Sequence, residues 1–386
     1  MPKVAIVGGG VSGCACASVL LKDGADVTIF EMGRGFGGRA STRRTREIPG
    51  LLVNHGAPIF DASNTDFEPL LSSLLEAGAI QKWSGVYASL EASTSDVSVE
   101  KSVMRYMGTP GMSSICEKLA EGVTRQAQTQ VTGFEWNSET WTLYDRNQQN
   151  LGTFDWVVVT GNSLASPRWR QTFSTEPPLV AAAETIACPE LVELVNAAGA
   201  LGTEPVMIAM LAFAPEASEC LKKLPFNIAE VRGHPILGKI VLQELDGPCP
   251  AVVIHSTSTF AEENKKTFGS TSTAARLGGP ADSNAEEIVI EAMVDAFSQV
   301  VKKHIGELPT PIWGPHLHRW GNAFPEALQG DQMYAEVPQV HFSMCGDFFS
   351  KPGVEAARIE TAALSGVEGA NSILKHISPS VMKPNL

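Results

Sequence analysis

The sequence has no apolar run near the roughly 18–20 residues that a membrane-spanning helix requires. It also has no surplus of basic residues, since 29 Lys and Arg stand against 42 Asp and Glu and give a formal net charge of −13. Nucleic acids and anionic lipid surfaces bind proteins through clustered Lys and Arg. We therefore expect no nucleic acid and no membrane as a partner, although a local group of arginines can still hold a small anionic ligand.

The seven cysteines are scattered and include no C-x-x-C pair. Cys14 and Cys16 fall in an expected helix at a spacing that points their side chains to different faces. We therefore expect no metal site, and reduced thiols favour the cytoplasm. The first expected strand begins at Lys3, which leaves no room for a leader peptide before it. An organelle would require that a transit peptide has been removed.

The sequence also lacks the G-x-S-x-G turn of serine hydrolases, and we find no paired-carboxylate signature. It begins instead with a strand–helix–strand pattern. Lys3–Val7 is apolar, Val11–Lys22 is rich in small and apolar residues, and Asp26–Phe30 reads as a second strand. This order predicts a parallel sheet.

The first turn, from Gly8 to Gly13, contains the pattern G-x-G-x-x-G. Gly8 permits the tight turn, Gly10 lets a pyrophosphate come close, and Gly13 lets helix and strand pack together. Val11 and Ser12 open the helix, whose free N–H groups and partial positive charge suit phosphates. A glycine-rich structural turn is the alternative to dinucleotide binding.

Glu31, followed by Met32, ends the second strand, where a carboxylate can accept hydrogen bonds from ribose hydroxyls. A structural turn leaves this residue unexplained. Gly37-Gly38-Arg39 resembles the second fingerprint of glutathione-reductase-type FAD proteins, in which the arginine can neutralise phosphate charge. Gly346-Asp347 resembles the pair that contacts the ribityl–pyrophosphate part of FAD in that superfamily, and Val131 begins a strand near its adenine contact.

A narrower resemblance rests on four further elements. Asn54-His55-Gly56-Ala57-Pro58-Ile59-Phe60 resembles the D-x-G-A-x-x-F element of the renalase-like branch of the amine oxidase superfamily. His318-Arg319-Trp320-Gly321-Asn322-Ala323-Phe324-Pro325 resembles its H-R-W-x-x-A-x-P element. Val253-Ile254-His255-Ser256-Thr257 resembles its V-I-H-T/S-T strand, and Gly353-Val354-Glu355-Ala356-Ala357 resembles its last element. The sequence departs from the pattern at three places. Asn54 stands where an Asp is usual, Asn322 stands where a Tyr is frequent, and Pro58-Ile59 replaces a more polar pair.

The resemblance implies an α/β FAD-binding domain with three layers around a parallel sheet, built from residues 1–164 and 336–386. A second α+β domain with a mixed sheet, residues 165–335, would cover the flavin. Strands around residues 80–110 could belong to either domain. The segment Thr267–Asn284 is rich in Ser, Thr, Ala and Gly and is expected to be an exposed, mobile insertion without chemistry.

The same resemblance implies an FAD-dependent oxidase. Non-covalent FAD would take a hydride from a small reduced substrate, and O2 would reoxidise the flavin and yield H2O2. The renalase-like branch implies an aberrant dihydronicotinamide isomer of NAD(P)H as substrate, and the wider superfamily implies an amine. A protein that uses FAD only as a structural or sensory element is the alternative from another class.

The candidates for lining the flavin are His55, Trp320 and Phe324. A hydrogen-bonded loop histidine is the alternative for His55, and packing between the domains is the alternative for the two aromatic residues. Near the C-terminus, Pro352-Gly353 predicts a helix start whose Val354 and Glu355 N–H groups face the pyrimidine edge of the flavin.

The cofactor assignment predicts that the purified protein is yellow and that mild denaturation releases FAD, because no cysteine lies in a recognised attachment motif. Chromatography of the released pigment checks this. Release of FMN would contradict the dinucleotide site, whereas pigment retained on the chain would contradict only the non-covalent mode.

Overall fold

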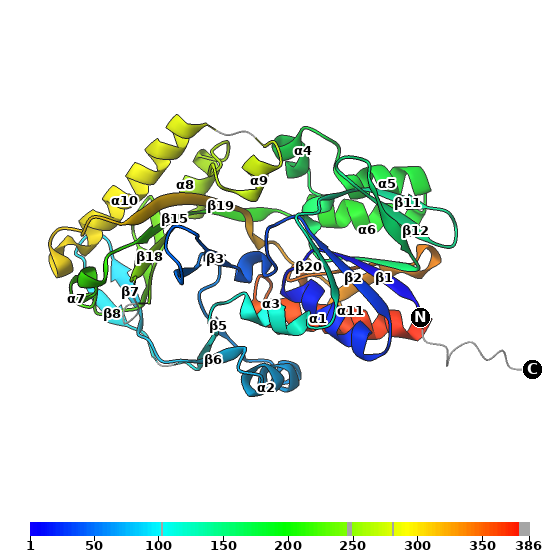
Figure 1. The fold of residues 1–386 in the computed structure, drawn as a ribbon, viewed down its shortest axis with the longest axis horizontal. Helices are drawn as coiled ribbons and strands as arrows, with labels where there is room; N and C mark the ends of the chain where they lie inside the picture. Colours follow the sequence, from blue (N-terminus) through cyan, green and yellow to red (C-terminus); the bar gives the residue numbers. More distant parts are fainter. Residues whose placement is uncertain (102, 245–248, 280–281, 378–386) are drawn as a thin grey trace, which may run out of the picture.

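The structure is a computed structural model that describes residues 1–101, 103–244, 249–279 and 282–377. Two β-sheets lie toward opposite ends of the long axis, each with its own helices (Figure 1). The polypeptide crosses between them several times, so each sheet contains segments that are far apart in sequence.

The first sheet has six strands in the order β10-β2-β1-β14-β22-β21, of which only β21 runs antiparallel to its neighbour. Its central strands are apolar on both faces, as a sheet covered on both sides requires. Because β22 pairs with β14, the C-terminal part of the chain completes a sheet that the N-terminus begins. The strands are β1 (Lys3–Val7), β2 (Asp26–Glu31), β10 (Thr124–Ala127), β14 (Trp156–Val159), β21 (Tyr334–Val337) and β22 (Phe342–Cys345).

Helices α1 (Val11–Lys22), α3 (Ser114–Leu119) and α11 (Ile359–Ile377) cover one face of this sheet. The other face packs against a three-stranded meander and two helices. These are β11 (Val131–Trp136), β12 (Trp141–Asp145), β13 (Asn150–Phe154), α5 (Pro178–Ile186) and α6 (Pro189–Ala200). The predicted three-layer domain with a parallel sheet is thereby confirmed.

The second sheet has seven strands in the order β19-β15-β18-β17-β16-β7-β8. Only the pair of β16 and β7 is parallel, so the sheet is mixed, as predicted. Its strands are β7 (Tyr87–Glu91), β8 (Val97–Val99), β15 (Thr203–Ala212), β16 (Ile228–Arg232), β17 (Leu237–Gln243), β18 (Ala251–Ser256) and β19 (Trp313–Pro325). The division of the chain into domains by residue number stays a prediction.

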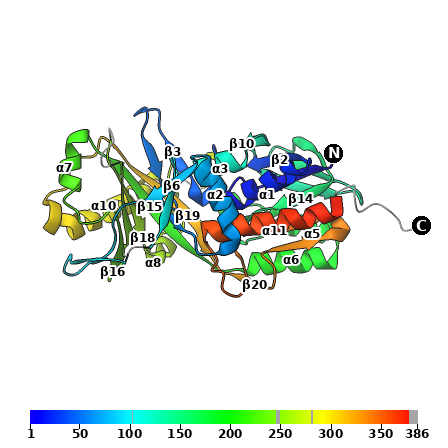
Figure 2. The same cartoon turned by 90° about the horizontal axis from the view of Figure 1, so that it is seen from below.

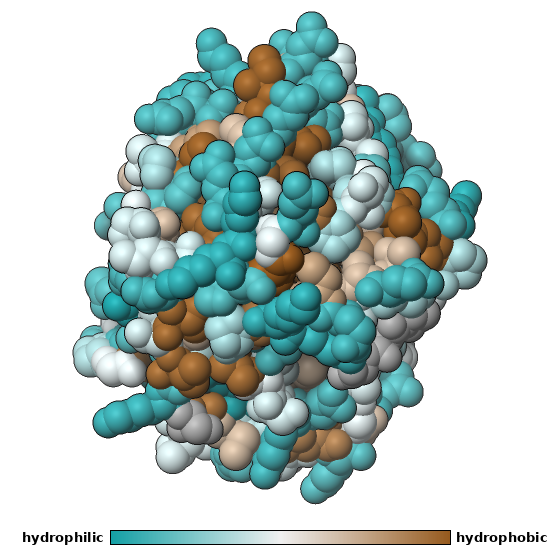
Figure 3. All heavy atoms as spheres, turned by 90° about the vertical axis from the view of Figure 1, so that its left-hand side faces the viewer, coloured by the Kyte–Doolittle hydropathy of each residue, from teal (hydrophilic) through white to brown (hydrophobic). Residues whose placement is uncertain are grey.

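Helix α10 (Ser283–Ile305) covers one face of the mixed sheet with buried residues at helical spacing, and Asp282 caps its N-terminus. The opposite face packs against β4 (Leu52–Asn54), which comes from the N-terminal part of the chain. Figure 3 shows the end of the molecule that this sheet and α10 form, where polar residues cover much of the surface and hydrophobic residues show between them in several patches.

The segment Thr267–Asn284 is not the exposed, mobile insertion that its composition predicts, although residues 280–281 lie outside the described part. Phe268 and Ser272 are buried, and Arg276 in α9 (Thr273–Arg276) donates a hydrogen bond of 2.6 Å to the Met32 carbonyl. The small residues serve close packing, because a Cβ added at Gly269 would lie 1.9 Å from the Leu317 carbonyl oxygen.

Helices α1 and α11 run side by side against the first sheet (Figure 2). Their closest approach depends on Gly366, where an added Cβ would lie 2.1 Å from the Ser12 carbonyl oxygen. Ser12 stands in the first turn of α1, directly after the glycine turn. Within the described residues, no helix combines the length and the apolar character needed to cross a bilayer.

This contact predicts that Gly366→Ala destabilises the protein by about 1–3 kcal/mol, the usual cost of overpacking a core. Gly369→Ala is the matched control in the same helix, because its added Cβ would meet atoms no closer than 3.5 Å. There the higher helix propensity of Ala would leave stability equal or raise it by up to about 1 kcal/mol. Urea unfolding of both variants measures the difference, and equal midpoints would contradict the close contact.

Candidate functional site

Two cavities adjoin between the sheets and share Glu31, Gly38 and Trp320 in their linings. We call the smaller one, of about 400 Å³, the glycine cavity. It brings together predicted cofactor residues from distant parts of the chain: Gly8, Gly10, Val11, Ser12, Glu31, Gly38, Arg39, Gly56, Ala57, Gly346 and Asp347, with Trp320 and Phe324.

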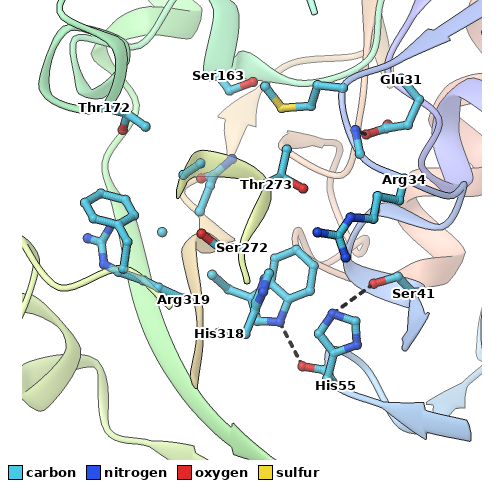
Figure 4. A pocket seen from close by; sticks show the side chains of 18 of the residues that line it. Glu31, Arg34, Ser41, His55, Ser163, Thr172, Ser272, Thr273, His318 and Arg319 are labelled. Carbon is cyan, nitrogen blue, oxygen red and sulfur yellow. Dashed lines mark hydrogen bonds between the residues drawn. The ribbon is translucent and has the colours of Figure 1, made fainter. Parts of the chain in front are cut away.

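We call the larger one, of about 590 Å³, the arginine cavity (Figure 4). Five arginines line it: Arg34, Arg43, Arg44, Arg168 and Arg319. The predicted residues Met32 and His55 line this cavity as well. Five predicted residues line neither cavity: Gly13, Val131, Gly353, Val354 and Glu355.

The glycine turn explains why side chains are excluded here. Gly8 has a φ of +119°, and a Cβ there would lie 2.3 Å from the Thr160 hydroxyl oxygen. A Cβ on Gly13 would lie 2.1 Å from the Gly8 carbonyl oxygen, so helix and strand pack backbone to backbone. At Gly10 the nearest atom would be Gly38 Cα at 3.9 Å, which leaves room for a ligand to approach the backbone.

The N-terminus of α1 offers hydrogen-bond donors without partners. Its cap residue is Gly10, which has no side chain to cap the helix, and the first helical hydrogen bond runs from Cys14 N–H to the Gly10 carbonyl. The Ser12 hydroxyl is buried beside the Cys345 thiol, has no nitrogen or oxygen partner among the described residues, and lines the glycine cavity. This donor set, together with the helix dipole, fits a pyrophosphate.

Glu31 lies at the end of β2 with its carboxylate on two backbone amides, Gly9 N–H at 2.8 Å and Gly33 N–H at 2.5 Å. Burial raises the pKa of this carboxyl, and the two amide hydrogen bonds oppose the rise. Each carboxylate oxygen can accept a further hydrogen bond. The geometry therefore leaves acceptors for a ribose diol, although no ligand contact is shown.

Arg39 contacts three other parts of the chain at the glycine cavity, through Asp347, Ala323 and Gly56. Its guanidinium pairs with the Asp347 carboxylate at 2.5 Å and donates to the Ala323 carbonyl at 3.0 Å. Gly56 packs on the same loop, since a Cβ there would lie 1.9 Å from the Arg39 carbonyl oxygen. The predicted contact of Arg39 with a phosphate stays a prediction.

The helix near the C-terminus begins at Ile359, and the predicted start at Val354 is wrong. Gly353 has a φ of +83° and Ala357 a φ of +60°, so the backbone leaves the helical path between them. The Val354 N–H donates to the Lys351 carbonyl at 2.9 Å and is not free for a ligand. Residues from Ala357 to Ile359, together with Ala362, line the glycine cavity instead.

His55 and Trp320 form the wall between the cavities. The Trp320 indole N–H donates to the His55 carbonyl at 2.8 Å, and the rings stack with centroids 5.4 Å apart (Figure 4). His318 packs edge-on against both rings. Burial lowers the pKa of His55 to about 4 and that of His318 well below its usual range, so both side chains are neutral at pH 7.

Two further lining residues were not predicted as site residues. Lys239 on β17 and His255 on β18 line the glycine cavity. Lys239 forms an ion pair with Glu230 at 3.0 Å, and burial lowers the pKa of His255 to about 3. A lone lysine in an apolar strand carries no local signal, because the mixed sheet alone brings it to the cavity. Among the described residues, no three His, Cys, Asp or Glu side chains gather to hold a metal ion.

Comparison with known proteins agrees with this geometry. Residues 6–75 match the NAD(P)-binding Rossmann-like domain. Tryptophan 2-monooxygenase from Allorhizobium ampelinum is 42% identical over 74 residues, which are 19% of this chain and 10% of that protein. The match thus spans about a tenth of that relative, and it does not carry over its activity.

Solved structures match over the whole fold. Cyclohexylamine oxidase from Brevibacterium oxydans superposes with a TM-score of 0.63 at 12% identity, over 97% of this chain and 99% of that one. Putrescine oxidase bound to putrescine gives a TM-score of 0.59 at 12% identity, over 97% and 99% of the two chains. The chain therefore has the fold of FAD-dependent oxidoreductases, a Rossmann-like domain joined to a mixed-sheet domain.

The position of Glu31 predicts that Glu31→Ala weakens FAD binding by about 1.5–3 kcal/mol, the range for a hydrogen bond to a charged group. Titration of the apoprotein with FAD, followed by flavin fluorescence, measures this. FMN lacks the adenosine ribose and serves as the control ligand, whose affinity should not change. The far-ultraviolet circular dichroism should stay that of the folded apoprotein. Equal losses for FAD and FMN would contradict the ribose assignment.

Proposed function

We propose that the protein binds FAD non-covalently in the glycine cavity and oxidises a small reduced substrate, with O2 as the electron acceptor and H2O2 as the product. The observation that carries this proposal is that the two sheets provide opposite walls of the glycine cavity. The dinucleotide turn forms one side, and Val206, Lys239 and His255 of the mixed sheet form the other. When bound, FAD would accept the hydride on its flavin ring.

The chain's own residues would bind and orient the cofactor. The α1 N-terminus and the Ser12 hydroxyl would hold the pyrophosphate, and Glu31 would hold the adenosine ribose. Trp320, fixed by its hydrogen bond to His55, would border the flavin ring and exclude water.

The charges around the cavities favour a dihydronicotinamide isomer of NAD(P)H, as in a renalase-like oxidase, over an amine. The linings contain three carboxylates, and each already has a partner. Glu31 accepts from backbone amides, Asp61 pairs with Arg358 at 2.9 Å, and Asp347 pairs with Arg39. A protonated amine would therefore find no free countercharge, whereas the arginine cavity suits a donor with an anionic tail.

An amine is the second candidate substrate, and one observation favours it. Two of the solved structures with the same fold are named cyclohexylamine oxidase and putrescine oxidase. A protein that holds FAD without turnover is the candidate from another class.

The proposal predicts that dihydronicotinamide isomers bleach the bound flavin under anaerobic conditions far faster than amines do, and that O2 then restores the yellow colour with H2O2 release. Stopped-flow absorbance with a panel that includes cyclohexylamine and putrescine measures this. Bleaching by amines alone would establish the second candidate. A flavin that no donor in the panel reduces would contradict the enzymatic proposal.

A further inference from the structure

The arginine cavity contains a pair of cationic side chains that the flavin site does not use. Arg168 begins α4 (Arg168–Phe173), and Arg319 lies on β19. Both guanidinium groups converge on Gly321, where an added Cβ would lie 2.1 Å from Arg168 Nη2 and 2.9 Å from Arg319 Nη1. The missing side chain at Gly321 thus makes room for two like charges close together.

Neither guanidinium group forms an ion pair within the described part of the chain. The Nε of Arg319 is buried without a hydrogen-bond partner there. Burial, followed by the charge of Arg319, lowers the pKa of Arg168 to about 10, so both groups still carry their charge at pH 7. The carboxylate that acts on both, Glu262, is itself paired with Lys265 at 2.6 Å.

Among the described residues, five other arginines of this acidic chain form ion pairs with carboxylates. Arg170, in the same helix as Arg168, pairs with Glu176, and Arg44 pairs with Glu117 at 3.2 Å. In a chain with a net charge of −13, two facing guanidinium groups without a carboxylate partner among the described residues repel each other in the folded apoprotein. Their repulsion would be relieved by an anion between them.

The surroundings of the pair match those of a phosphate site. Thr172 and Ser272 line the same cavity (Figure 4). The Ser272 hydroxyl accepts from the Ala275 N–H and keeps its own hydrogen for a ligand. The Thr172 hydroxyl instead donates to the Arg168 carbonyl at 3.2 Å. The Arg319 guanidinium is held over the Phe268 ring, 5.5 Å from its centroid. A planar guanidinium group can donate two parallel hydrogen bonds to two oxygens of one phosphate, which neutralises charge on the phosphate and fixes its orientation.

We propose that Arg168 and Arg319 form a subsite for the phosphate of a phosphorylated substrate, whose reacting ring lies at Trp320. Trp320 lines both cavities and directly follows Arg319 in β19, so one strand connects the subsite to the flavin side. The proposal deepens the proposed function and rests on it for the identity of the reacting ring. The phosphate subsite itself does not require that the ring be a nicotinamide.

The test is equilibrium binding of ADP and of inorganic pyrophosphate to the FAD-loaded enzyme by calorimetry, which needs no turnover. Arg168→Gln and Arg319→Gln should each weaken binding roughly ten- to hundredfold, the range for one lost charged hydrogen bond. Arg170→Gln is the matched control, because its guanidinium is paired outside the cavity, and it should bind as the wild type does. Arg319→Lys should recover part of the affinity, because it restores the charge without the planar fork.

A kinetic arm separates the phosphate from the ring. For dihydronicotinamide mononucleotide the two glutamine variants should raise KM with little change in kcat, and for the phosphate-free riboside they should change neither. Both variants should unfold at or above the wild-type midpoint, because each removes one of two repelling charges.

Each result has a defined consequence. Arginine-dependent ADP binding without reduction by any dihydronicotinamide would support the subsite and overturn the proposed donor. Wild-type enzyme that binds neither ADP nor pyrophosphate would overturn the subsite, and so would variants that bind both as tightly as the wild type does. Loss of FAD from the glutamine variants, with ADP affinity unchanged after reloading, would assign the pair to the cofactor and also overturn it.

Discussion

The backbone of Gly9 is the point on which the rest of the site depends. Its N–H donates to the Glu31 carboxylate, and its carbonyl accepts the Gly37 N–H at 2.8 Å. One residue in the middle of the glycine turn therefore fixes the end of β2 and the start of the Gly37-Gly38-Arg39 loop. A Cβ there would lie 2.6 Å from the Phe36 ring, so a side chain would push the loop away. The position of Arg39 follows from this backbone contact.

Arg39 also connects the glycine cavity to the second sheet. Its hydrogen bond to the Ala323 carbonyl reaches β19, and the Trp320 indole on the same strand reaches back to the His55 carbonyl. The two contacts run in opposite directions between the same two parts of the chain. Strand β19 is thus tied to the N-terminal part of the chain at two points, Trp320 and Ala323, beside the space between the sheets. A substrate in this space would meet a prearranged surface, which reduces the cost of ordering side chains on binding.

The sequence predicted well what depends on neighbouring residues. The glycine turn and Glu31 could be predicted because a strand–turn–helix unit has a local signature. The Gly37-Gly38-Arg39 loop was predicted from its resemblance to a fingerprint of FAD proteins. The predicted start of the C-terminal helix was wrong, although Pro352-Gly353 is a typical sequence before a helix. The backbone instead turns at Ala357, whose N–H donates to the Asp347 carbonyl.

Long-range packing accounts for the other differences. Small residues in Thr267–Asn284 are typical of mobile loops, yet the same residues allow the contact of Gly269 with Leu317. Arg168 and Lys239 come to the cavities only through tertiary structure, and no spacing along the chain relates them to the glycine turn. The roles of the individual site residues stay predictions for the same reason, because they depend on ligands as well as on packing.

Two titratable groups of the arginine cavity, His55 and Arg168, keep their charge state over the pH range in which most enzymes work. The pKa of His55 is lowered to about 4 and that of Arg168 to about 10, so neither group changes charge between about pH 5 and 9. The net charge of −13 acts over longer distances and repels an anionic substrate, but salt screens it beyond about 10 Å. Selectivity for an anion would therefore arise inside the cavity, from groups that keep their charge, and would not depend on attraction from afar.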